Sequence, residues 1–179
     1  MFVNFFDRLA EKLGLRSNTP IKPLPDTRRE NLQILLERMK RYKRSGDYDK
    51  ALAEIEHATA IISGYQESLV NETLPFALRL HTADIYTQQK RYADAQNMLL
   101  TLQNDAEQHK QKAYLAYVLI ALGVWEQEQE QWDLARDYYE RALRVAKEYK
   151  LLGAEGRAQG HLADTYLHDG NASYASYLL

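Results

Sequence analysis

Cysteine is absent from the sequence, and proline and glycine are scarce, with four and eight residues respectively. Without a thiol, the chain can form neither a disulfide nor a thiolate metal site, and it has no cysteine nucleophile. Proline and glycine are the residues that most often interrupt helices, so their scarcity favours long helical segments. Because Ala, Leu, Glu, Gln, Arg and Lys dominate the middle of the chain, we expect an all-α fold.

The chain also lacks a strong charge of either sign and a long apolar run. Its formal net charge is −2 over 179 residues, which argues against nucleic acid as a partner, since nucleic-acid-binding domains are usually strongly basic. No stretch approaches the ~20 apolar residues of a transmembrane helix. Charged residues between Met1 and Leu13 interrupt the apolar run that a signal peptide needs. These absences favour a cytoplasmic protein.

No constellation typical of catalysis or of cofactor binding occurs in the sequence. It has no phosphate-binding glycine loop and no nucleophile elbow. Of the five histidines, only His161 and His168 share a helical face, where Asp164 would complete a carboxylate–histidine metal site. A surface or packing role is the stronger interpretation of such a triplet. We therefore predict a protein that is not an enzyme, with no catalytic residues, no cofactor and no metal ion.

What the sequence does contain is a repeat in four copies. Two antiparallel helices cross closely where one has a small side chain and a larger neighbour fills the space beside it. One alignment column is alanine throughout, spaced 44, 40 and 40 residues apart: Ala51, Ala95, Ala135 and Ala175. Three positions earlier is a mostly aromatic column: Tyr48, Tyr92, Trp132 and Ala172. Twelve positions before the alanines is a mostly small column: Met39, Ala83, Gly123 and Ala163.

Each copy is predicted to be a helical hairpin, and the hairpins must stack into an α-solenoid, because one hairpin alone cannot cover its apolar face. This array should fill residues 27–179, after an amphipathic helix at 1–14 and a proline-rich linker at 15–26. The expected helix pairs are 27–45 with 48–63, 73–89 with 92–108, 112–130 with 132–149, and 154–169 with 172 onward. The fourth repeat is apolar to its end, so we expect either that the natural chain continues past Leu179 or that another chain covers this end.

The repeat columns resemble those of the tetratricopeptide repeat family. The best match is Ala121-Leu122-Gly123 followed by the segment from Trp132 to Leu143, and the second best runs from Gly46 to Leu52. The period of 40 or more exceeds the family's usual ~34 residues, and the proline that commonly closes each repeat is absent. In period alone, the chain is similar to kinesin light chains and to bacterial regulators with such arrays.

The resemblance implies a right-handed superhelix whose concave face is lined by the first helix of each pair and binds an extended or helical peptide. Family members that bind the carboxyl terminus of chaperones place Lys and Asn where this chain has Leu36 and Lys40, so that ligand is disfavoured. By helical phase, the residues expected on the concave face are Leu36, Lys40, Lys43, Arg44, Leu80, Asp84, Gln88, Tyr117, Ile120, Val124, Gln127, Arg157, Asp164 and His168.

The predicted function is therefore a scaffold or adaptor that binds a protein or peptide. The alternative is a sensor or regulatory domain of a larger signalling or transcription-regulatory protein. Two charged runs bear on the partner: one basic, with Arg38, Lys40, Arg41, Lys43 and Arg44, and one acidic, with Glu126, Glu128 and Glu130. Each is either part of a bipolar groove or, as the stronger interpretation, a solvated helix face.

The N-terminal segment carries an apolar stripe opposite Asp7, Glu11 and Lys12. The stripe consists of Phe2, Phe5, Phe6, Leu9 and Leu13. Such a face needs to be buried. We expect it to cap the array or to exchange into a neighbouring molecule, which would make the chain a homo-oligomer. A membrane-surface anchor is the weaker alternative, because the polar face is mixed in sign rather than basic.

Overall fold

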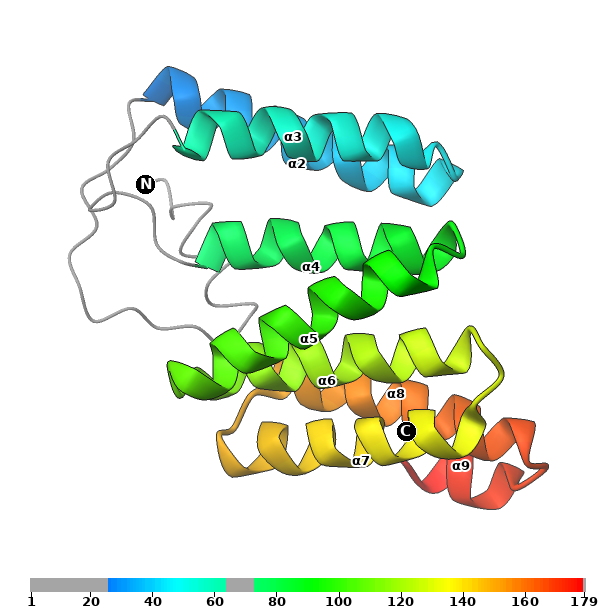
Figure 1. Ribbon diagram of the computed structural model, residues 1–179. Coiled ribbons are helices and arrows are strands. Elements are labelled where there is room, and N and C mark those ends of the chain that lie inside the picture. The colour runs from blue at the N-terminus through cyan, green and yellow to red at the C-terminus, as the bar shows by residue number, and fades with distance from the viewer. Residues whose placement is uncertain (1–25, 64–72, 179) are drawn as a thin grey trace.

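The computed structural model describes residues 26–63 and 73–178, and these two ranges contain eight helices and no strand (Figure 1). The predicted all-α class is therefore confirmed. The predicted helix at 1–14 lies outside the described residues, as does the linker apart from Asp26. The helices are α2 (Asp26–Ser45), α3 (Tyr48–Ser63), α4 (Thr73–Gln88), α5 (Tyr92–Gln108), α6 (Lys112–Gln127), α7 (Trp132–Glu148), α8 (Leu152–His168) and α9 (Ala172–Leu178).

The four residues of the aromatic column each begin a second helix, as the repeat predicted. Helices α3 and α5 have the expected bounds, whereas α2 and α4 differ from them by one residue at one end, and α6, α7 and α8 also differ at their ends. The clearest error is in α6, which was expected to reach residue 130 but ends at Gln127. Glu130 has a φ of 61°, and the Gln131 N–H donates to the Glu126 carbonyl oxygen at 3.0 Å. This backbone turn ends the helix, although the glutamate-rich sequence itself favours helix.

The same turn closes most of the helices. In each case one residue adopts a positive φ, and the next backbone N–H donates to the carbonyl five residues before it, as in a Schellman motif. The Leu151 N–H, for example, donates to the Ala146 oxygen at 2.8 Å. The residues with positive φ in these turns are Gly46, Lys90, Lys110, Glu130, Lys150 and Gly170. Only two of the six are glycine, the residue that adopts this conformation without steric cost.

The repeat columns form the helix crossings. The four alanines of the first column are at most 1% exposed, and the small column is buried in all four copies. At Gly123, a Cβ atom on the backbone would overlap Cε1 and Cδ1 of the Tyr139 ring, so this crossing requires glycine. The sequence-based explanation of the columns, a small residue beside a large one, is confirmed at this position.

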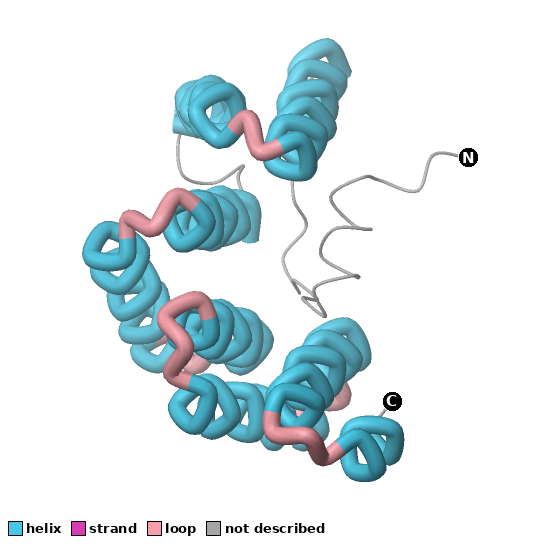
Figure 2. Tube along the Cα trace, turned by 90° about the vertical axis from the view of Figure 1, so that its right-hand side faces the viewer, coloured by secondary structure: helices cyan, strands magenta, loops and turns pink. Residues whose placement is uncertain are grey.

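The helices lie in two layers, with α2, α4, α6 and α8 on one side and α3, α5 and α7 on the other. Viewed along the helices, the stack curves, and the layer of first helices lies on the concave side (Figure 2). We call the side of this layer that is turned away from α3, α5 and α7 the inner face.

The core is divided between two clusters, and α4 contributes to both of them. Leu74, Leu78 and Ile85 of α4 pack with buried residues of α2 and α3. Phe76 and Ala83, on another side of the same helix, pack with α5, α6, α7 and α8. The first hairpin is therefore joined to the rest of the array through one shared helix.

Candidate binding face

The inner face is formed by side chains that contact one another from repeat to repeat. The Phe76 ring of α4 stacks on the Tyr114 ring of α6, with centroids 4.1 Å apart and an interplanar angle of 15°. The guanidinium of Arg157 in α8 lies 5.5 Å from the centroid of the Tyr117 ring in α6. Lys43 of α2 forms an ion pair with Asp84 of α4. These three contacts connect the four first helices into one surface.

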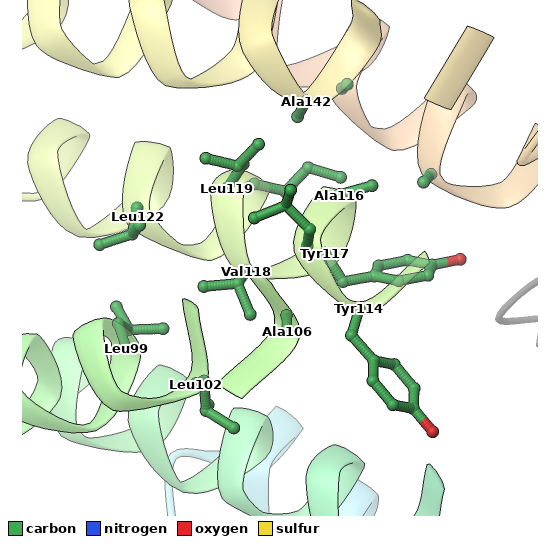
Figure 3. Close-up of a cluster of buried hydrophobic side chains, with 14 of the residues drawn as sticks. Leu99, Leu102, Ala106, Tyr114, Ala116, Tyr117, Val118, Leu119, Leu122 and Ala142 are labelled. Carbon is green, nitrogen blue, oxygen red and sulfur yellow. The ribbon is translucent and has the colours of Figure 1, made fainter. Parts of the chain in front are cut away.

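Tyr114 and Tyr117 give the middle of this face an apolar character. Both rings extend from α6 on the same side of the buried cluster that contains Leu99, Leu102 and Val118 (Figure 3). Each tyrosine is only 4% exposed, and burial raises the pKa of the Tyr117 hydroxyl. Both therefore behave as core aromatics on a face that was expected to be open.

A histidine that sequence analysis did not assign to this face, His81 of α4, lies among its charged groups. The pKa of His81 is lowered to about 4, mainly by burial and next by the positive charge of Lys43. Asp84 acts in the opposite direction, and Arg157 and Lys40 act in the same direction as Lys43. His81 is therefore neutral at pH 7, and its imidazole adds a weakly polar group between the aromatic rings and the ion pair.

His161 and Gln127 meet at the buried tyrosine of α7. The imidazole of His161 stacks on the Tyr139 ring with centroids 5.1 Å apart, and the Tyr139 hydroxyl donates to Gln127 Oε1 at 2.9 Å. Burial lowers the pKa of His161, and the negative charge of Asp164 opposes this shift. His161 thus has a packing role, and the described part of the chain contains no metal-binding group of three or more His, Cys, Asp or Glu side chains.

The structure separates the predicted groove residues into three groups. Leu36 is 5% exposed and lies in the core cluster of the first hairpin, so its side chain is not at the surface. His168 stacks on Trp132 of α7, with centroids 3.9 Å apart, and so contacts the second-helix layer. The third group consists of the other predicted residues. They all lie in the first helices, and their side chains range from buried to exposed: Lys40, Lys43, Arg44, Leu80, Asp84, Gln88, Tyr117, Ile120, Val124, Gln127, Arg157 and Asp164.

The basic run of α2 does not form one patch. Arg38 turns toward Glu54 of α3 at 3.9 Å, and Lys40 pairs with Glu37 at 2.8 Å within α2. Lys43 is held by Asp84, as described above. The run is thus spread over several sides of the helix, in agreement with the solvated-face interpretation. At the acidic run, the Gln88 amide donates to Glu128 at 3.4 Å, which links the ends of α4 and α6.

A separate open depression of about 350 Å³ lies between α4 and α5, away from the inner face. Its charged side chains already pair with one another or with neighbours. Arg91 contacts Asp94 at 2.7 Å and lies 4.0 Å from the centroid of the Tyr86 ring. Arg79 contacts Asp105 at 2.8 Å. The polar groups of this depression are therefore less available to a partner than those of the inner face.

Residues 76–148 match the family model described as tetratricopeptide repeat. This segment is a tetratricopeptide repeat. The match begins near the start of α4 and ends with α7, and it confirms the family predicted from the repeat columns. Tetratricopeptide repeats generally mediate protein–protein interaction, and all-helical repeats of this kind typically act as non-enzymatic scaffolds. Neither the comparison with curated proteins nor the comparison with solved structures gave a match.

Helical phase predicted only part of this inner face. It identified Leu80 and Tyr117, but it missed Phe76 and Tyr114, which lie one turn earlier on the same helices. Extending the phase by one turn in the N-terminal direction would have found both.

Within the described residues, none of the helices is both long and apolar enough to cross a membrane.

Proposed function

We propose that the tetratricopeptide array is an interaction scaffold or adaptor that binds a peptide or protein segment on its inner face. The observation that carries the proposal is the continuous inner surface of α4, α6 and α8. On it, the stacked rings of Phe76 and Tyr114 adjoin Tyr117 and Arg157. We expect the partner to be a protein rather than nucleic acid, and the cytoplasm to be its compartment.

The chemistry of the surface suggests how a segment would be held. Aromatic side chains bury large areas at little cost in conformational entropy, which is why they dominate the energetics of many interfaces. The charged groups beside them, Arg157 and the pair of Lys43 and Asp84, would set the direction of the bound segment. A partner with an apolar or aromatic anchor next to a charged residue fits this arrangement best.

The proposal can be tested by selecting displayed peptides on the full chain and measuring their affinities. Arg157→Glu reverses a charge on the inner face without removing a buried group, because Arg157 is exposed. Selected peptides should bind this variant at least tenfold more weakly. Arg144→Glu makes the same change at an exposed position of α7 and serves as the matched control. A selection that yields no binders, or an equal loss in both variants, would contradict the proposal.

A second candidate function, a sensor or regulatory domain, is favoured by the divided core. Within residues 26–63 and 73–178, α4 is the one helix that contributes to both core clusters, so a ligand that contacts both α2 and α8 would change the angle between the two clusters. The radius of gyration in solution scattering should then change when a selected peptide binds. An unchanged radius with full binding would leave the scaffold as the better description.

A further inference from the structure

We propose that residues 1–14 dock on the inner face of their own array, as a tethered ligand that any outside peptide must displace. This inference names an occupant for the inner face. It rests on the proposed function only in treating that face as a binding surface.

The burial of α6 favours an occupant on the inner face. No residue from Ala113 to Ile120 is more than 9% exposed, although this segment covers more than two turns of helix. Helices α5 and α7 cover its outer side, and α4 and α8 flank it in the layer of first helices. A helix at the inner side of an open two-layer array would leave a polar stripe facing water. Instead, α6 has Tyr114 and Tyr117 there, so its sequence is suited to a covered inner face.

The side-chain chemistry of the N-terminal segment fits an apolar, aromatic surface. Its stripe contains Phe2, Phe5 and Phe6, followed by Leu9 and Leu13. A fully buried aromatic side chain removes roughly 150–250 Å² from water, so the three phenylalanines alone supply a strong drive toward an apolar surface. Aromatic rings also pack favourably on other aromatic rings, and the inner face offers Phe76, Tyr114 and Tyr117.

The segment between residue 14 and α2 is long enough to let residues 1–14 reach the inner face. Helices α2, α4 and α6 run in the same direction, so Asp26, at the start of α2, lies at the same end of the array as Tyr114, near the start of α6 (Figure 1). The eleven residues 15–25 span roughly 36 Å when extended, and Pro20, Pro23 and Pro25 favour extended conformations. Packed helices lie about 10 Å apart, so the extended tether spans more than three such distances. The tether is therefore long enough for docking within one molecule.

Tethering also favours the same molecule over a second copy. A short linker holds its ligand at an effective concentration on the order of 1 mM, far above a micromolar protein concentration. Docking within one chain should therefore prevail in dilute solution. A membrane is a poorer destination, because the charges opposite the stripe include Asp7 and Glu11 and give little attraction to anionic lipid.

Cross-linking of the full chain tests the docked position. The sequence has no cysteine, so an introduced pair is unique. Arg8→Cys leaves the apolar stripe intact and is combined with Arg157→Cys on the inner face. The control combines it with Gln96→Cys, an exposed position of α5 on the outer layer. With a short bis-maleimide at micromolar protein, the inner pair should link within one molecule at least tenfold faster than the outer pair.

Equal rates for the two pairs would overturn the inference, and so would cross-links that form mainly between two molecules. The double substitution Phe5→Asp and Phe6→Asp, introduced into the inner pair, should remove its advantage. Circular dichroism of this variant checks that the array remains folded. If the substituted chain is folded and still links at the original rate, the apolar stripe does not dock on the inner face.

A binding measurement separates this inference from the proposed function. A labelled synthetic peptide of residues 1–14 should bind the full chain with Phe5→Asp and Phe6→Asp roughly 10- to 100-fold more tightly than the unmodified chain, whose own segment competes. If selected peptides bind the inner face but the 1–14 peptide binds neither chain, self-docking is wrong and the scaffold stands. If only the 1–14 peptide binds, self-docking stands and the scaffold proposal fails.

Discussion

The first and third hairpins are built on the same repeat columns but fill their crossings in opposite ways. In α2 and α3 the small-residue column holds Met39, and the position facing it four residues after the column alanine holds Ile55. In α6 and α7 the corresponding residues are Gly123 and Tyr139. All four are buried. A larger residue on one helix is thus matched by a smaller one on the other, so the repeat maintains the filled volume of the crossing rather than a residue type.

The largest loss of stability is expected when Gly123 of the third hairpin is replaced by Met, the residue that the first hairpin has at the equivalent position. Gly123→Met should lower the free energy of unfolding by about 3 kcal/mol or more, because even a Cβ at this position would overlap the Tyr139 ring. Chemical denaturation measures the loss. The double variant Gly123→Met with Tyr139→Ile should recover part of it, because it recreates the pair found in the first hairpin. If the two substitutions were simply additive, volume matching would not explain the columns.

The next largest effect concerns His81, which the inner face keeps neutral. Its folded pKa of about 4 lies below the ordinary value of 6.5. Protonation therefore favours the unfolded chain below pH 6.5, and stability is full above that pH and is lost as pH falls toward 4. Between pH 7 and 5 the free energy of unfolding should fall by about 2 kcal/mol. His81→Gln should show a smaller fall in urea denaturation at the two pH values; an equal fall would show that His81 is not the cause.

The closing turns offer a smaller test of the same two hairpins. The first turn has Gly46 at φ 78°, whereas the third has Glu130 at φ 61°. Only glycine adopts this conformation without steric cost. Glu130→Gly should therefore raise the free energy of unfolding by about 0.5–1 kcal/mol, and Gly46→Ala should lower it by about 1 kcal/mol. Thermal denaturation measures both changes. A shift in the same direction for the two variants would contradict this explanation.

The smallest expected effect is that of the ion pair between the first two repeats. Lys43 and Asp84 are each about 30% exposed, and partly exposed pairs contribute little. Asp84→Asn should reduce the free energy of unfolding by less than ~1 kcal/mol, and the loss should shrink in high salt. Asp137→Asn, which removes an i,i+4 pair within α7, is the control. If Asp84→Asn lowered the free energy of unfolding more than Gly123→Met, polar contacts would contribute more to the stability of the array than packing at the helix crossings.

The sequence was most informative where a local pattern has one physical solution. The aromatic and alanine columns located the starts of α3, α5, α7 and α9, because a small residue must lie at each crossing. Helix ends were harder to predict. Lys90 and Glu130 are ordinary helix-forming residues, and nothing local indicates that they adopt a positive φ. Their conformation follows from the packing of the helices on either side of the turn.

The candidate site likewise has features that the sequence predicts and features that depend on packing. Helical phase selected Lys43, Asp84 and Arg157, which lie in the first helices, and it also selected Leu36, which is in the core. Phase gives the direction of a side chain relative to its own helix, whereas exposure depends on which helices pack around it. The contacts that connect the inner face, such as Phe76 with Tyr114, join residues 38 positions apart and have no signature in the sequence.

The sequence by itself therefore determined that this chain is helical and contains a tetratricopeptide repeat at residues 76–148, because helix propensity and the spacing of small and aromatic residues are local properties. Only the tertiary structure decided that Ala113 to Ile120 of α6 are all buried, that His81 lies neutral among charged groups, and that α4 contributes to two core clusters. Those features depend on distant helices that pack together and exclude water, which no short stretch of sequence can specify.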